Sequence, residues 1–136
     1  MDHKIATLFA RILLGLIFGM QGLGKVFKIG VSNIYNGGFK GYEETFLPTF
    51  ILKFAAYFTS YAEFICGFLL ILGLFRKQSY YILGIVLLIV SFGHGLQNPI
   101  WDLSHVMYRS ILLIFLMMIP LAKDTISLDN TFFNRN

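Results

Sequence analysis

Residues 54–75 read FAAYFTSYAEFICGFLLILGLF, and this stretch decides the fold. It is apolar almost throughout, and at about 1.5 Å per residue a helix of this length crosses the roughly 30 Å hydrocarbon core of a bilayer. Glu63 lies near its middle. A carboxylate at that depth is costly, and ionisable side chains inside membranes commonly mark functional sites. Glu63 is therefore the first candidate for a functional residue.

The composition extends this interpretation to the whole chain. Hydrophobic residues make up 57% of the 136 positions and charged residues only 13%, which is about half the share found in soluble domains. So much apolar surface predicts a lipid bilayer as the chain's main partner. The formal charge of +4 comes from Lys and Arg scattered along the sequence. Without a basic run, the sequence argues against nucleic acid as a partner.

Four strongly apolar segments predict four transmembrane helices, at about 5–27, 53–75, 79–97 and 106–122, followed by a polar tail at 123–136. The predicted fold class is an all-α membrane protein, an antiparallel four-transmembrane-helix bundle forming one domain, 1–136. The first segment spans the membrane only if Arg11 and Lys25 extend towards opposite interfaces. We reject a cleavable signal peptide because Arg11 interrupts the apolar region and no small-x-small motif follows Gly24.

The connections between the segments predict the direction of the helices. The longest joins the first two segments and contains Asn36-Gly37-Gly38, which indicates a turn. In the same connection Tyr42, Phe46 and Leu47 could form one face of a short interfacial helix. The shortest connection, 76–78, reads Arg-Lys-Gln and predicts an antiparallel hairpin.

Charge gives the orientation in the membrane. Lys and Arg divide six to five between the two sides of the predicted bundle, so the total count hardly discriminates. The positive-inside preference is strongest in short loops. Arg76 and Lys77 therefore favour the cytoplasmic (inner) membrane with both termini in the cytoplasm.

Five polar side chains form the predicted ligand-binding cluster: Arg11, Gln21, Glu63, His94 and Arg109. From the rise per residue, Gln21, His94 and Arg109 lie within roughly 10 Å of the non-cytoplasmic side. Glu63 lies near the midplane, and Arg11 lies towards the cytoplasmic side. We expect Gln21, Glu63, His94 and Arg109 to line one cavity that opens towards the long connection, with Arg11 closing its cytoplasmic end.

Simpler explanations compete for the charged members of this cluster. Glu63 could form an ion pair with Arg11 or Arg109 that fixes the helix register, or a protonated carboxyl hydrogen-bonded across helices. Arg11 could extend to the interface, and Lys25 has the position of an interfacial anchor. These alternatives stay open on the sequence.

The positions of small residues predict that the polar side chains face the inside of the bundle. Gly15 and Gly19 are spaced for close helix approach in the first segment, and Arg11 lies one turn before Gly15 on the same face. In the third segment Gly84, Ser91 and Gly95 form a comparable stripe, flanked by His94.

Several chemistries are excluded or left open by the remaining residues. Cys66 is the only cysteine, so the chain contains no disulfide and no dithiol pair. His94 could be an acid/base group, a hydrogen-bond donor to a quinone, a haem ligand or a satisfied interfacial histidine. Bis-histidine haem is disfavoured because His3 and His105 lie outside the segments. No cluster with metal-ligand spacing occurs, and no catalytic residue is assigned.

Three short motifs carry a family resemblance. They are RILLGLIF from Arg11, QGxxK from Gln21 to Lys25, and AExxxGxLxxLGLFR from Ala62 to Arg76. Together they resemble the DoxX family over about residues 5–122. The resemblance implies a four-helix membrane fold and an association with membrane redox systems, including a thiosulfate:quinone oxidoreductase. This chain has Gln21 where that family commonly has histidine, which removes a titratable group.

The leading functional hypothesis is a subunit of a membrane redox assembly with a quinone-binding pocket, and at most one part of a quinone-linked oxidoreductase. A redox or other membrane protein partner is expected, and the oligomeric state stays open. The alternative is a non-catalytic membrane scaffold or assembly partner. Small-solute transport is a weaker alternative because the sequence lacks an internal repeat and paired broken helices.

Overall fold

The computed structural model describes residues 2–98 and 104–132, and within these ranges it is helical with no strand. Four long helices form the bundle: α1 (Asp2–Leu23), α3 (Thr49–Leu72), α4 (Arg76–Gln97) and α5 (Ser104–Met118). Six short helical segments complete the chain: η1 (Gly24–Ile29), α2 (Val31–Ile34), η2 (Tyr35–Phe39), η3 (Lys40–Glu44), η4 (Leu121–Lys123) and α6 (Leu128–Phe132). The prediction of an all-helical fold is confirmed.

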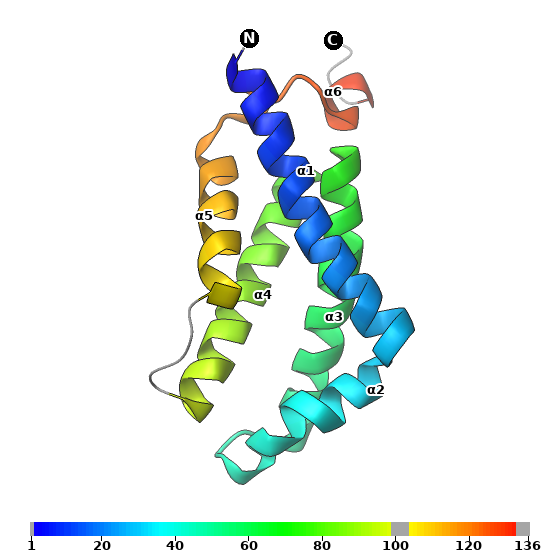
Figure 1. The fold of residues 1–136 in the computed structure, drawn as a ribbon, viewed down its shortest axis with the longest axis vertical. Coiled ribbons are helices and arrows are strands. Elements are labelled where there is room, and N and C mark those ends of the chain that lie inside the picture. The colour runs from blue at the N-terminus through cyan, green and yellow to red at the C-terminus, as the bar shows by residue number, and fades with distance from the viewer. Residues whose placement is uncertain (1, 99–103, 133–136) are drawn as a thin grey trace.

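Figure 1 shows the two ends of the bundle. The start of α1 and the short helix α6 lie at its upper end, and α2 with the neighbouring segments lies at its lower end. In this view α1 and α4 run downwards, whereas α3 and α5 run upwards. The terms upper end and lower end refer to this view throughout.

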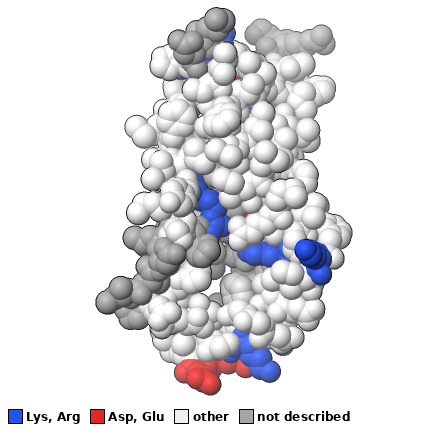
Figure 2. All heavy atoms as spheres, viewed as in Figure 1, with Lys and Arg blue, Asp and Glu red and all other residues white. Residues whose placement is uncertain are grey.

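Three helices within the described residues are long and apolar enough to cross a membrane: His3–Ile29, Thr49–Leu72 and Arg76–Gln97. The fourth predicted segment, 106–122, is shorter in the structure, where its apolar helical part runs from Val106 to Met118. Pro120 explains this early end, because proline cannot continue a helix. In Figure 2 the upper half of the face is almost uncharged, whereas Lys and Arg side chains appear near its middle and at its lower end.

Helix α3 has its polar and small residues on the inside. Its buried stripe includes Thr59, Ser60, Glu63 and Gly67, whereas large hydrophobic side chains face outwards, among them Phe54, Tyr57, Tyr61, Ile65, Phe68 and Leu72. A soluble protein has the reverse arrangement. In lipid, large apolar side chains are solvated by acyl chains, and small residues let helices approach.

The closest helix contact joins α1 to α3. A Cβ added to Gly67 would collide with the backbone of Gly19, and one added to Gly15 would lie 2.8 Å from the Gly67 carbonyl oxygen. The predicted role of Gly15 and Gly19 in close helix approach is therefore confirmed. On α4 the prediction is wrong for Gly95, because no described atom lies within 4 Å of a Cβ added there.

In the structure the turn between α3 and α4 lies at residues 73–75, just before the predicted position at 76–78. Gly73 adopts the left-handed conformation, with φ of 72°, and the Leu74 amide donates to the Leu69 carbonyl oxygen at 2.9 Å. This bond closes the end of α3, as a left-handed glycine commonly does. Arg76 therefore begins α4 and is buried, so it does not belong to an exposed loop.

The long connection is helical where a turn was predicted. Gly37 and Gly38 lie inside the π-helical segment η2. Tyr35 and Phe39 flank these glycines and pack in a second core at the lower end, which explains why tertiary contacts override the turn signal. Tyr42 and Leu47 also pack there, but the predicted third member of their face, Phe46, is exposed.

Candidate functional site

Arg11 belongs to a polar network at the upper end. Its Nη1 donates to the carbonyl oxygens of Leu70 at 2.5 Å and Ile71 at 3.2 Å, and its Nη2 donates to the carbonyl oxygen of Ile126 at 2.6 Å. The last carbonyls of a helix have no partner within the helix, so Arg11 satisfies the end of α3. Its Nε lies 3.0 Å from Asp124 Oδ2, which adds an ion pair.

Arg76 completes this network from the start of α4. Its Nη1 lies 2.9 Å from Asp124 Oδ2, and its Nε lies 3.0 Å from Asp129 Oδ2. Asp129 also accepts hydrogen bonds from the backbone amides of Phe75 and Arg76 at 2.8 and 3.1 Å. We call Arg11, Arg76, Asp124 and Asp129 the upper cluster.

The upper cluster corrects the predicted polar tail. Asp124 is buried, and Asp129 lies in the short helix α6, so this part of the tail folds onto the bundle; residues 133–136 lie outside the described residues. Burial raises the pKa of Asp129, but the hydrogen bonds from Arg76 and Phe75 outweigh it and lower the pKa below its ordinary value. Asp129 therefore favours its ionised form.

Glu63 has its main partner on the first helix. Lys25 Nζ donates to Glu63 Oε2 at 2.6 Å, and the exposed fractions of these side chains are 18% and 0%. Helical side chains point back towards the N-terminus of their helix, so a long lysine at the end of the span can reach a group deeper in the bundle. The other carboxylate oxygen, Glu63 Oε1, has no hydrogen-bond partner among the described residues.

Arg109 approaches the same region from α5. Its Nη1 donates to Gln21 Oε1 at 2.7 Å, and its guanidinium carbon lies 5.5 Å from the centre of the Phe18 ring. The Glu63 carboxylate also interacts electrostatically with Arg109. We call Gln21, Lys25, Glu63 and Arg109 the lower cluster.

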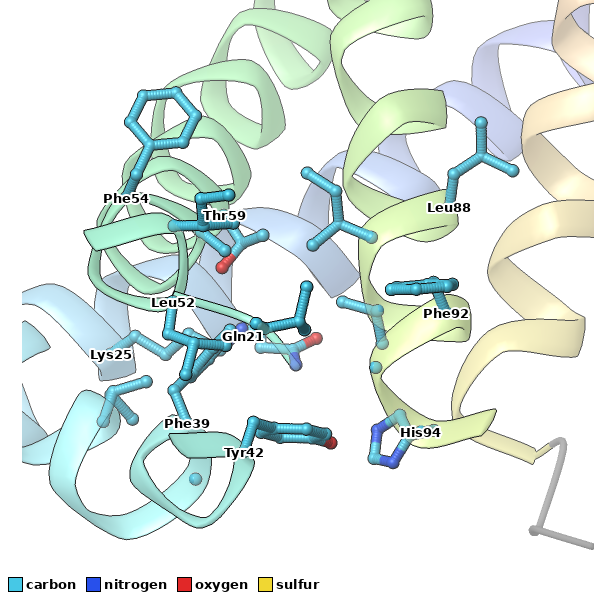
Figure 3. A pocket seen from close by; sticks show the side chains of 18 of the residues that line it. Gln21, Lys25, Phe39, Tyr42, Leu52, Phe54, Thr59, Leu88, Phe92 and His94 are labelled. Atoms are coloured by element: carbon cyan, nitrogen blue, oxygen red, sulfur yellow. The ribbon is translucent and has the colours of Figure 1, made fainter. Parts of the chain in front are cut away.

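A cavity of about 770 Å³ lies beside the lower cluster. Its lining is mostly apolar and combines side chains from five regions of the chain: Gln21 and Lys25, Phe39 and Tyr42, Phe54 and Thr59, Leu88 with Phe92 and His94, and Arg109. In Figure 3 the side chains of α3 and α4 lie on opposite sides of the cavity, and Tyr42 points towards His94 below it. Phe54, Leu88 and Phe92 are all exposed, so the cavity opens between α3 and α4 on the outer surface of the bundle.

The family model of DoxX matches residues 6–96. The chain belongs to the DoxX family. No curated protein and no solved structure matches the chain significantly. The family membership and the apolar helices together make this DoxX chain an integral membrane protein.

The DoxX match contains only part of each cluster. It includes Arg11 and Arg76 of the upper cluster, whereas Asp124 lies beyond it. It includes Lys25 and Glu63 of the lower cluster, whereas Arg109 lies beyond it. Each cluster of this DoxX protein is therefore completed by the C-terminal third of the chain.

The structure brings together some of the predicted site residues. Gln21, His94 and Arg109 line the cavity. Glu63 lies behind Lys25 and does not line it. The prediction for Arg11 is wrong, because the end of α3 and Asp124 hold its side chain at the upper end.

The sequence interpretation missed two features of this DoxX site. Lys25 was interpreted as an interfacial anchor but is the direct partner of Glu63; its spacing of four residues from Gln21, on one helix face, was the available signal. Phe39 and Tyr42 enter the cavity from the long connection, where the apolar pattern gave no signal that they would fold back beneath α3 and α4.

Proposed function

We propose that this DoxX protein binds the head group of a quinone in the cavity and acts as one subunit of a membrane redox assembly. The observation that carries the proposal is an apolar cavity of about 770 Å³ whose lining includes the polar side chains of Arg109, Lys25 and Gln21. Ligand sites of this kind combine apolar walls with a few polar groups that orient the ligand. A quinone needs such a slot for its ring and donors for its two carbonyl oxygens.

The donors come from different helices. Arg109 and Lys25 carry N–H groups and line the cavity, and His94 stands at the edge of the cavity near Tyr42. A quinone ring lying between α3 and α4 would place one carbonyl near Arg109 and the other near His94. Its isoprenoid tail would leave between Phe54 and Phe92 into the surrounding lipid.

Quinone extraction tests this function. Protein purified from native membranes in mild detergent should yield about one quinone per chain, and Arg109→Gln should yield much less. Lys28→Gln is the matched control, because Lys28 is exposed and does not line the cavity. Absence of quinone together with a stable co-purifying membrane protein would reject quinone binding and favour the scaffold.

For the membrane arrangement we propose four spans with the upper end in the cytoplasm. Support for the spans comes from the alternating directions of α1, α3, α4 and α5. Exposed lysines are balanced, with Lys4, Lys77 and Lys123 at the upper end and Lys28, Lys40 and Lys53 at the lower end, so the orientation depends on Lys77, which lies next to the shortest connection. The burial of Arg11 and Arg76 removes both from the positive-inside comparison, because their charges are matched inside the protein.

Cysteine labelling tests this arrangement. Asn36→Cys and Gln78→Cys are made separately in a Cys66→Ser background, since both positions are exposed and Cys66 is the only native cysteine. An impermeant thiol reagent applied to intact cells should label position 36 and leave position 78 unlabelled until the cells are opened. Labelling of both positions from the same side would reject the four-span arrangement.

A further inference from the structure

The polar lining of the cavity carries an excess positive charge. Lys25 and Arg109 both line the cavity, and the carboxylate next to them is Glu63. With all three groups ionised, the lower cluster has one positive charge more than it has negative charges. Gln21 is neutral and accepts a hydrogen bond from Arg109, so it orients the guanidinium without balancing its charge.

Within residues 2–98 and 104–132, no carboxylate lies within ion-pair distance of Arg109. Glu63 is bonded to Lys25 at 2.6 Å. The Arg109 side chain is buried against Phe18 and Gln21. A buried guanidinium loses its hydration, and an anion close to it compensates for that loss.

We propose that the cavity binds an amphiphile whose head group carries one negative charge on oxygen. The anionic oxygen contacts Arg109, and the apolar tail passes between Phe54 and Phe92 into the lipid. This inference rests on the cavity used in the proposed function and specifies the charge of its ligand. Two sources share the required chemistry: a fatty-acid carboxylate and the anion of a reduced quinone.

A tail-matched pair of probes tests the charge requirement. The protein is placed in phosphatidylcholine nanodiscs and mixed with [1-¹³C]palmitate or with hexadecanol, and empty nanodiscs give the lipid background. Palmitate should show a protein-bound carboxylate resonance that stays ionised at lower pH than palmitate in empty nanodiscs. An equal concentration of hexadecanol should not displace it. Equal binding of the acid and the alcohol would overturn the charge requirement.

Two variants change the charge of the cluster in opposite directions. Arg109→Gln removes one of the two cations that share Glu63 and should weaken palmitate binding by at least about tenfold, whereas Arg109→Lys should retain part of it. Glu63→Gln removes the negative charge of the carboxylate and leaves Lys25 without an ion pair, so palmitate should bind as tightly as before or more tightly. Parallel loss in Arg109→Gln and Glu63→Gln, with both proteins folded, would overturn the proposal.

The variant Asp102→Asn tests whether a carboxylate of the chain itself is the counter-ion of Arg109. Asp102 is chosen because it is the acidic residue nearest to Arg109 in sequence. If the wild-type protein binds no palmitate and Asp102→Asn does, Asp102 supplies the missing charge and the proposal fails. Unchanged palmitate binding in Asp102→Asn supports the proposal.

A quinone arm separates the two sources and keeps this inference distinct from the proposed function. Decylubiquinone is added to the same nanodiscs and titrated through its reduction while electron paramagnetic resonance is recorded. An anionic semiquinone signal that disappears in Arg109→Gln identifies quinone as the source. Neutral quinone bound by wild type and lost in Arg109→Gln, with no semiquinone signal and no palmitate site, would leave the proposed quinone binding standing and reject the anionic ligand.

Discussion

The upper and lower clusters contain similar side chains but differ in how completely their charges are matched. At the upper end, Arg11 and Arg76 face Asp124 and Asp129, and carbonyl oxygens take the remaining guanidinium donors. At the lower end, two cations share one carboxylate beside a cavity of about 770 Å³. A polar residue inside a membrane protein is therefore not a functional residue merely because of its depth.

The difference follows from what surrounds each cluster. The segment 120–132 folds across the upper end and brings both acidic side chains and backbone carbonyls to the arginines. At the lower end the long connection contributes the aromatic side chains Phe39 and Tyr42. These residues shape a cavity and supply no negative charge next to Arg109, so a ligand can complete the lower cluster.

Asp124→Asn should have the largest effect, because it removes the carboxylate shared by two buried arginines. The side chains of Arg11 and Arg76 are only 1% and 3% exposed, and breaking a buried ion pair costs about 3–5 kcal/mol. Thermal unfolding can be followed with a thiol-reactive dye, because Cys66 is buried in the folded protein. Glu44→Gln removes an exposed carboxylate and should leave the transition unchanged. An unchanged transition in Asp124→Asn would show that the upper cluster does not stabilise the fold.

Gly67→Ala tests the close contact between α1 and α3, which lies between the upper and lower clusters. The added Cβ would collide with the Gly19 backbone, so α1 and α3 must separate, at a cost of about 1–3 kcal/mol. Gly95→Ala is the matched control, since it adds a methyl group where no described atom lies within 4 Å. Equal melting temperatures for the two variants would contradict the close contact.

Glu63→Gln makes at the lower end the same carboxylate-to-amide change as Asp124→Asn. We expect a loss of only about 1–2 kcal/mol, because the amide oxygen still accepts a hydrogen bond from Lys25 and the lysine is partly exposed to the cavity. Glu63→Leu removes the acceptor and should cost more. If Glu63→Gln proves as destabilising as Asp124→Asn in the same dye assay, the proposed difference between the clusters is wrong.

Asp129→Asn should have the smallest effect, about 1 kcal/mol at neutral pH, because it weakens a side-chain cap at the start of α4. The pKa of Asp129 is lowered in the folded protein, so its contribution is present above the pKa of the unfolded chain and is lost as pH falls through the folded pKa. Wild type should lose this stability in acid, and Asp129→Asn should lose less. Identical acid unfolding curves would exclude this contribution.

Much of the fold could be predicted from sequence, because local patterns determine the long helices. The apolar stretch around Glu63 predicted α3, and Gly15 with Gly19 predicted the close approach of α1. The hairpin was misplaced because two local signals compete there, and the left-handed Gly73 ends α3 before the charged residues that resembled a loop.

The candidate site was less predictable, because its contacts join distant parts of the chain. The depths calculated along the helices predicted that Gln21, His94 and Arg109 lie near the same end of the bundle. In the structure these three residues line one cavity. The same calculation gave no reason to pair Arg11 with Asp124, which belongs to a segment interpreted as a polar tail. Lys25 was missed because depth was counted at the backbone, whereas its side chain reaches further into the bundle to Glu63.

The long separation of Arg11 from its partners also affects biosynthesis. Arg11 donates to the carbonyl oxygen of Ile126, 115 residues later. At translation rates of about 5–20 residues per second, this distance corresponds to roughly 6–23 s during which the guanidinium of the nascent chain lacks that acceptor and Asp124. A chain that stops before Asp124 would therefore leave the Arg11 guanidinium without its carboxylate partner and without the Ile126 carbonyl oxygen.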